Sequence, residues 1–158
     1  MPGAPFLIRA AEDEDRLPLA IVFAAVAEER DGIATEPPVD VEARAAGWTL
    51  DGTLVAVAGA EVVGSVHVDA SRHGFGELGM AVAREWRQRG VGSALLAAAI
   101  DWAREQGLHK LSLSVFAHNE AAIGLYRKVG FVEEGRRVKQ YRRASGELWD
   151  AIDMGLLL

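Results

Sequence analysis

The stretch RQRGVGSALL, residues 87–96, places two glycines around one valine, directly before an Ala/Leu-rich helical pattern. Two arginines and a glutamine precede the glycines. Glycine allows another molecule to approach the backbone closely, and the first turn of a helix presents unpaired N–H groups. The stretch therefore predicts either a plain strand-to-helix turn with solvated arginines or a site for phosphate groups at the helix start.

The spacing R-x-x-G-x-G, from Arg87 to Gly92, differs from two common phosphate-binding motifs. The dinucleotide fingerprint requires G-x-G-x-x-G, and the P-loop requires a lysine followed by serine or threonine. The spacing alone does not decide between the turn and the phosphate site.

The composition favours one globular domain covering residues 1–158, since half of the residues are hydrophobic. The absence of cysteine excludes disulfides, thiolate metal sites and cysteine nucleophiles. A formal net charge of −6 disfavours nucleic-acid binding. No apolar run reaches the roughly 18–20 residues that span a membrane, and the early acidic residues disfavour a signal peptide. We expect a cytoplasmic protein without membrane or nucleic-acid partners.

Hydrophobic periodicity and turn residues predict a mixed α/β fold. We expect strands at residues 6–10, 53–58, 61–69, 75–83, 110–116, 136–143 and 148–158, and helices from 12–15 to about 30, at 39–46, from 90–92 to about 106, and at 119–130. In the first helix, Leu17, Ile21, Ala24 and Ala25 share one predicted apolar face. Strands 75–83 and 110–116 are separated by one helix, so we expect them to run parallel in an otherwise mostly antiparallel sheet.

A second motif, NEAAIGLYRKVGF, occupies residues 119–131. On a helix, Asn119, either Ala122 or Ile123, and Tyr126 lie along one stripe, because offsets of three, four and seven share a face. Asn119 also suits the role of N-cap, and Tyr126 that of a half-buried aromatic residue.

Together, the two motifs resemble the signature of the GNAT superfamily of acyl-CoA-dependent N-acyltransferases. The family carries [R/Q]-x-x-G-x-[G/A] between its fourth strand and third helix, and N-x-x-A-x-x-L-Y-x-x-x-G-F on a later helix. The predicted order of elements fits that fold over nearly the whole chain. The resemblance implies a twisted sheet whose parallel central strands splay apart around the pantetheine arm of acetyl-CoA, which serves as cosubstrate without a metal.

The resemblance also implies the binding residues. Backbone groups of Met80 to Val82 would bind the pantetheine, and N–H groups from Gln88 to Ala94 the pyrophosphate, where glycine at 90 and 92 leaves room for the phosphates. The full set of expected cofactor-binding residues is Met80, Ala81, Val82, Arg87, Gln88, Arg89, Gly90, Val91, Gly92, Ser93, Ala94, Asn119, Ala122 and Tyr126.

For catalysis, the resemblance assigns Tyr126 as the acid that protonates the departing thiolate. Some relatives carry a glutamate on the fifth strand, where this chain has Val115. Glu77 is then the best carboxylate candidate for the base. Alternatively, Glu77 is only an outward-facing strand residue without a catalytic role. His118 or water could serve instead, whereas His67 and His73 lack any supporting sequence context.

The acceptor is expected to be a primary amine that attacks directly in a ternary complex. Neutralising a lysine-like amine at pH 7 costs roughly 4–5 kcal/mol, and an α-amine only about 1 kcal/mol. Without a dedicated base, an α-amine of an amino acid, an analogue or a peptide N-terminus is favoured. The alternatives are a polyamine or aminoglycoside-like acceptor, or a non-catalytic acyl-CoA-binding regulatory module.

Residues 28–38 and 136–149 are expected to form the acceptor pocket. Their acidic side chains could receive an ammonium group, and their basic ones, among them Arg137 and Arg143, a carboxylate. The apolar C-terminal residues and Trp149 suit either a homodimer surface or the sheet core.

Overall fold

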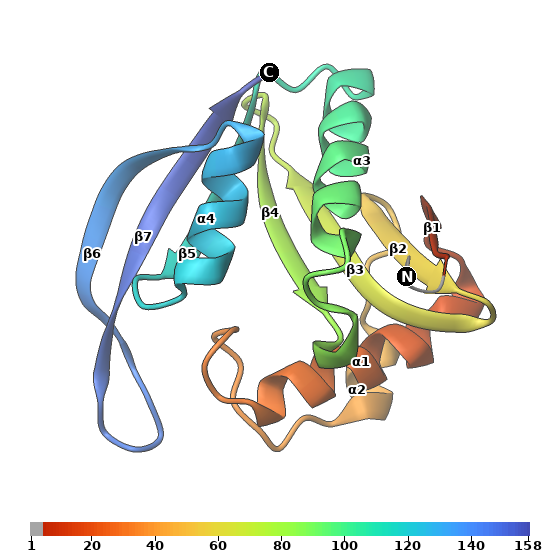
Figure 1. Cartoon of the computed structure of the whole chain (residues 1–158), viewed down its shortest axis with the longest axis horizontal. Helices are drawn as coiled ribbons and strands as arrows, with labels where there is room; N and C mark the ends of the chain where they lie inside the picture. Colours follow the sequence, from red (N-terminus) through yellow and green to blue (C-terminus); the bar gives the residue numbers. More distant parts are fainter. Residues whose placement is uncertain (1–4) are drawn as a thin grey trace.

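The computed structural model describes residues 5–158, which fold into one mixed sheet with helices on both faces (Figure 1). The strands are β1 (Leu7–Ala10), β2 (Thr53–Ala58), β3 (Glu61–Ala70), β4 (Phe75–Val82), β5 (Lys110–Phe116), β6 (Val132–Arg142) and β7 (Leu148–Leu157). The helices are α1 (Arg16–Glu28), α2 (Val41–Ala46), α3 (Val91–Glu105) and α4 (Glu120–Val129), with single 3₁₀ turns η1 (Asp13–Asp15) and η2 (Arg84–Trp86). None of the helices in the described residues is both long and apolar enough to cross a membrane.

The sheet has seven strands in the order β1-β2-β3-β4-β5-β7-β6. β2, β3 and β4 form the expected antiparallel meander, and β4 runs parallel to β5, as predicted. The parallel pair is short, because register partners exist only between Phe75–Glu77 and Lys110–Ser112. Beyond Glu77 the two strands diverge, and the edge of β4 that faces β5 has no strand partner there.

Two apolar clusters hold the helices against opposite faces of the sheet. Val66 and Leu78 pack with Leu95 of α3 and Ile123 of α4, whereas Leu19 of α1 packs with Val55 of β2. Burying such side chains contributes roughly 1.5–3 kcal/mol each. The gap between β4 and β5 therefore lies between two layers of helices.

The predicted apolar face of α1 is wrong. Leu17 and Ile21 are 48% and 53% exposed, whereas Leu19 and Ala20 are buried. The sequence of α1, RLPLAIVFAAVAE, is apolar almost all round, so helical periodicity cannot select one face. The contact between Leu19 and β2 selects it instead.

The β6–β7 hairpin is longer than predicted. β6 begins at Val132 rather than at 136, because residues 132–135 pair with residues 153–155 of β7. Pairing with a neighbouring strand overrides the weak strand preference of Glu133, Glu134 and Gly135. In Figure 1 the hairpin curves away from the rest of the sheet and reaches toward the loop that joins α1 to α2.

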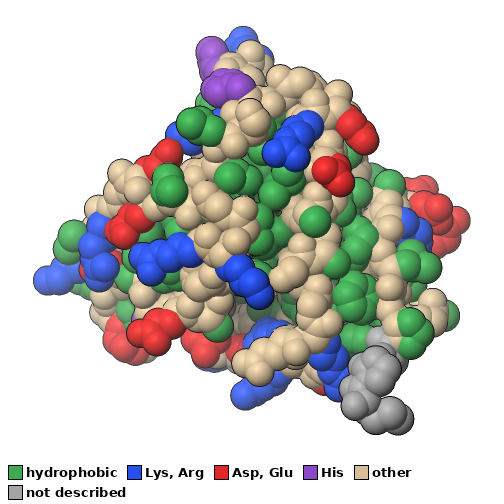
Figure 2. All heavy atoms as spheres, turned by 45° about the horizontal axis from the view of Figure 1, so that its top comes forward, with side chains coloured by type: hydrophobic (Ala, Val, Ile, Leu, Met, Phe, Trp, Pro, Cys, Tyr) green, Lys and Arg blue, Asp and Glu red, His purple; other side chains and the backbone are tan. Residues whose placement is uncertain are grey.

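On the face drawn in Figure 2, basic and acidic side chains are interspersed around apolar ones. Neither sign of charge dominates this face.

Candidate active site

A cavity of about 840 Å³ opens where β4 and β5 diverge. Its walls come from the end of α1 and the loop after it, the second half of β4, the start of α3, the end of β5 and the first turns of α4. Among its lining residues are Glu29, Ile33, Met80, Ala81, Val82, Arg84, Gln88, Gly90, Gly92, Ser93, Phe116, Asn119, Ala122, Tyr126 and Tyr141. The cavity thus connects both sequence motifs with the α1–α2 loop.

The start of α3 is open to an anion. Its N-cap, Gly90, has a left-handed φ of 84° and supplies no side-chain cap. Gln88, two residues earlier, also has a positive φ, 59°, which is uncommon for a residue with a side chain. The N–H groups of the first helical turn have no intrahelical acceptor, so they are available to a diphosphate in the cavity.

Gly92 is constrained by packing as well as by the cavity. A Cβ at this position would lie 2.9 Å from Leu125 Cδ2 of α4 and 3.5 Å from Met80 Cε. Room for phosphates, the reason inferred from the sequence, is therefore only part of the account. The second glycine also permits α3 and α4 to approach each other beside β4.

Arg87 is already paired in this structure. Its Nη1 and Nη2 atoms donate to the two carboxylate oxygens of Glu29 at 2.6 and 2.7 Å, and its Nε donates to the Val82 carbonyl at 3.1 Å. This pair lowers the pKa of Glu29, mainly through the hydrogen bond. Arg87 thus fastens the end of α1 to the end of β4, and a phosphate-binding role for its side chain stays a prediction.

The other members of the loop differ in placement. The Arg89 guanidinium stacks over Trp86 at 4.9 Å from the ring centroid, outside the cavity lining. The Val91 side chain is buried in the core, so only its backbone can reach a ligand. Ala94 lies one turn into α3, and its N–H donates to Gly90 O. Arg84 does line the cavity and was not singled out from the sequence, since it precedes the motif.

Asn119 acts as the N-cap of α4. Its Oδ1 accepts a hydrogen bond from the Ala122 N–H at 3.2 Å, as the sequence suggested. The side-chain amide group is left over for a ligand in the cavity that Asn119 lines.

Tyr126 lies on the buried side of α4, with only 7% of its surface exposed. Its ring packs edge-on against Phe131, and among residues 5–158 its hydroxyl has no hydrogen-bond partner. Burial raises the pKa of Tyr126 to about 12. The phenol therefore stays protonated at neutral pH and can donate a proton into the cavity that it lines.

Glu77 does not share the cavity that Tyr126 lines. It is exposed on β4, opposite Asp69 of β3 and Ser112 of β5, and is absent from the lining of the cavity. Side chains alternate across a strand, and the neighbouring Leu78 packs against the α3 side. Glu77 therefore points to the other face of the sheet, outside the hollow that holds Tyr126.

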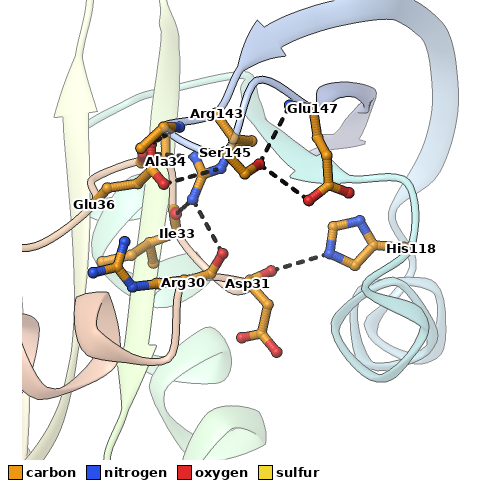
Figure 3. Close-up of polar contacts among 10 residues, drawn as sticks. Arg30, Asp31, Ile33, Ala34, Glu36, His118, Arg143, Ser145 and Glu147 are labelled. Atoms are coloured by element: carbon orange, nitrogen blue, oxygen red, sulfur yellow. Dashed lines mark hydrogen bonds and ion pairs between the residues drawn. The ribbon is translucent and has the colours of Figure 1, made fainter.

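A buried arginine joins the α1–α2 loop to the β6–β7 turn (Figure 3). Arg143, in the turn between β6 and β7, is 4% exposed. Its Nη1 donates to Ala34 O at 2.8 Å, and its Nη2 donates to Arg30 O and Ile33 O at 3.2 and 3.4 Å. The guanidinium also lies 4.5 Å from the centroid of Trp149. Its two terminal nitrogens are occupied by the α1–α2 loop, so Arg143 is neither solvated nor free to receive a carboxylate.

Two further contacts tie the same loop down. The Ala144 N–H donates to Glu36 at 2.9 Å, and His118 Nε2 lies 3.3 Å from the Asp31 carbonyl. Figure 3 shows these contacts around Arg143, which joins the α1–α2 loop to the β6–β7 turn. The two segments that the sequence analysis assigned to the acceptor pocket are thus in direct contact.

A second cavity, of about 530 Å³, lies on the α1–α2 side of β3 and β4. It shares Ile33, Gly79, Met80 and Ala81 with the larger cavity, so the two meet at β4. Its other lining residues are Phe23, Arg44, Gly47, Trp48, Thr49, Ser65 and His67. Sequence reasoning did not find this cavity, because its residues come from four separate elements without a motif.

Comparison with known proteins decides the family. The family model described as "Acetyltransferase (GNAT) family" matches residues 20–131, a span that includes both motifs. The chain belongs to the GNAT family of acetyltransferases.

Three GNAT relatives illustrate the range of similarity. The L-amino acid N-acetyltransferase AaaT of Escherichia coli (strain K12) is 36% identical over 109 residues, 64% of this chain. The match spans 65% of AaaT, just under two thirds of its length. The crystal structure of a ribosomal-protein-alanine N-acetyltransferase from Brucella melitensis is 32% identical, with a TM-score of 0.87 over 96% of this chain and 99% of that one. The structure of yncA from Salmonella typhimurium, which contains acetyl-CoA, is 23% identical, with a TM-score of 0.87 over 97% of this chain and 94% of that one. At 23% identity, this last similarity shows that the two chains share the fold and nothing further.

Proposed function

We propose that the chain is an N-acetyltransferase that moves an acetyl group from acetyl-CoA to the α-amine of an amino acid, an amino-acid analogue or a peptide N-terminus. The observation that carries the proposal is the continuous cavity from the uncapped start of α3, past Tyr126, to the α1–α2 loop. The names of two relatives, an L-amino acid N-acetyltransferase and a ribosomal-protein-alanine N-acetyltransferase, support an α-amine acceptor.

The residues of the cavity suit acetyl-CoA, which supplies an activated thioester. The first N–H groups of α3 would hold the diphosphate, where the helix dipole favours negative charge. Backbone groups of Met80 to Val82, on the β4 edge without a strand partner, would hydrogen-bond the pantetheine amides. The side-chain amide of Asn119 would add a donor beside them.

Tyr126 would give its proton to the departing thiolate. Its raised pKa, about 12, keeps the phenol protonated throughout the neutral range. A positioned acid of this kind typically accelerates a reaction 10²- to 10⁴-fold. For the base, Glu77 is the candidate from sequence, although its side chain lies outside both cavities.

The acceptor would bind beside the α1–α2 loop, which Arg143 fastens to the β6–β7 turn. Tyr141 and Phe116 line this end of the cavity. An aromatic wall favours acceptors with an apolar side chain, whereas a polyamine would need several carboxylates. Of the three acidic residues that line the cavity, Glu29 is already paired with Arg87, which leaves Asp31 and Glu120 as candidates to receive the acceptor ammonium group.

A free-thiol assay with acetyl-CoA tests the proposal against a panel of amines that includes free amino acids, N-terminal peptides, spermidine and an aminoglycoside. We expect thiol release that depends on an α-amine. Binding of CoA without release with any amine would support the non-catalytic module instead. Absence of a CoA-dependent thermal shift at millimolar CoA would overturn the whole assignment.

Three broader expectations from the sequence belong to this proposal. The whole chain would act as one acetyltransferase domain, it would work in the cytoplasm, and it would form a homodimer. Light scattering of the purified protein and fractionation of cells that express it would test the last two.

A further inference from the structure

We propose that His67 is the general base of the reaction and accepts a proton from the acceptor ammonium group at Nε2. The inference rests on the proposed function, and it assigns a role to the second cavity, which that function does not use. Its lining joins that of the larger cavity at Gly79, Met80 and Ala81.

The hydrogen bonds of Thr53 fix the tautomer of His67. Thr53 Oγ1 donates its single hydrogen to the Thr49 carbonyl at 2.6 Å, and it also lies 2.8 Å from His67 Nδ1. Since the hydroxyl hydrogen is already used, the second contact requires Nδ1–H to donate to Oγ1. Nε2 is then the unprotonated nitrogen, with its lone pair on the side of the ring away from Thr53.

The sheet places His67 next to the reaction site. Thr53, His67 and Gly79 are register partners across β2, β3 and β4, so they project from the same face. Directly opposite residues on neighbouring strands are about 5 Å apart. Gly79 has no side chain, and a Cβ there would meet nothing within 4 Å. Open space therefore leads from the imidazole across Gly79 to the gap beside Met80, where the thioester would lie.

The charges around His67 suit a base at neutral pH. Burial lowers the pKa of His67, and the negative charges of Asp69 on β3 and Asp51 before β2 partly oppose this shift. Arg44 of α2, which lines the same cavity, adds a positive charge. Among the described residues, Nε2 has no hydrogen-bond partner that would hold its lone pair.

The competing groups are less well placed. Glu77 lies outside both cavities. His118 is exposed, stacks on Phe116 and contacts the Asp31 carbonyl, so its Nε2 carries the hydrogen and serves to hold the loop. His118 also lines the larger cavity and keeps a lone pair on Nδ1, but its ring is exposed and tied to the α1–α2 loop. His67 is half-buried and lies on β3, directly opposite Gly79 of β4.

The proton balance is complete with the groups named. The ammonium gives its first proton to His67 Nε2, and the neutral amine forms the C–N bond at the thioester carbonyl carbon. The second N–H proton leaves to solvent as the C–S bond breaks, and the thiolate takes the phenol proton of Tyr126. Solvent then restores the phenol and removes the imidazolium proton, so the products are the amide, free CoA thiol and one released proton.

The test compares His67→Gln and Glu77→Gln with a matched control, His73→Gln, which alters an exposed turn histidine. With the best α-amine at pH 7, we expect His67→Gln to lose about 10²- to 10³-fold in kcat, with the CoA-dependent thermal shift unchanged. His73→Gln should match the wild type. Because the pKa of His67 is lowered, the wild-type rate should already be level at neutral pH, whereas the rate of His67→Gln should climb about tenfold per pH unit toward the pKa of the amine.

Two results would overturn the assignment of His67 as the general base. One is a kcat of His67→Gln within threefold of wild type with an unchanged pH profile, above all if Glu77→Gln shows the loss instead. The other is a ¹⁵N spectrum of the unmodified protein at pH 7 in which His67 Nε2 carries the hydrogen, a readout that needs no activity. A wild-type chain that releases no thiol with any amine would overturn the proposed function and the base together, which separates that failure from failure of the base alone.

Discussion

Replacing Arg143 with methionine should destabilise the fold by about 3 kcal/mol. The loss follows from the acceptors, which are backbone carbonyls of residues 30, 33 and 34 and therefore stay in place after any substitution. A hydrogen bond from a charged donor contributes about 1.5–3 kcal/mol, and an unsatisfied buried carbonyl costs about 1–3 kcal/mol. The 2.8 Å bond to Ala34 should supply most of the effect, and the two longer bonds less.

Part of that loss is offset. Methionine fills much of the same volume, and it removes a buried charge whose Nε has no hydrogen-bond partner among residues 5–158, although this nitrogen lies 3.9 Å from Glu36 Oε1. For a chain of this size, 3 kcal/mol corresponds to a decrease in Tm of about 6–12 °C. Arg143→Lys keeps the charge but cannot reach several carbonyls with a planar fork, so we expect an intermediate loss.

Urea unfolding of Arg143→Met, with Arg142→Met as the matched exposed control, measures the effect. The same variant should raise the KM for the acceptor more than it weakens CoA binding, because the loop that it releases would form the acceptor end under the proposed function. A free energy of unfolding within 0.5 kcal/mol of wild type, with an unchanged acceptor KM, would refute the reasoning.

Three other predictions concern the site and the fold. Tyr126→Phe should lower kcat about 10²-fold without changing CoA affinity, measured by turnover and calorimetry, and equal turnover would exclude the phenol as acid. Gly92→Val should cost about 1 kcal/mol in urea unfolding, because its Cβ would lie 2.9 Å from Leu125 Cδ2 and the end of that side chain must move, and an unchanged stability would show that Leu125 moves without cost. The hydrogen bond from Arg9 lowers the pKa of Asp15, so its contribution to stability is present above the unfolded pKa of about 3.9 and is lost as pH falls through the lower folded value. The stability of Asp15→Asn, measured from pH 6 to pH 2, should accordingly fall less steeply than that of the wild type.

Local patterns predicted much of the fold. The meander of β2 to β4, the parallel pairing of β4 and β5, and the start of α3 at Gly90 follow from turn residues and strand alternation. The N-cap role of Asn119 could be predicted for the same reason, since it depends on residues only three positions apart.

Features that depend on distant residues could not be predicted. In the sequence RRVKQYRR, nothing distinguishes Arg143 from the exposed charges beside it. It is buried because it contacts a loop more than a hundred residues earlier in the chain. The tautomer of His67 is fixed by its contact with Thr53, which lies fourteen residues away on a neighbouring strand. The buried face of α1 was missed because an almost uniformly apolar helix is oriented by its neighbours.

The contact around Arg143 also limits how acceptor preference can change within this architecture. Residues 30–34 and residue 143 come from opposite ends of the chain, yet each supplies half of one hydrogen-bonded unit. A chimaera that exchanges the early loop alone would leave a guanidinium facing carbonyls of altered geometry, and one that exchanges the late turn alone would leave the carbonyls without donors. Grafting a new selectivity onto this scaffold therefore calls for transplanting both segments as a matched pair.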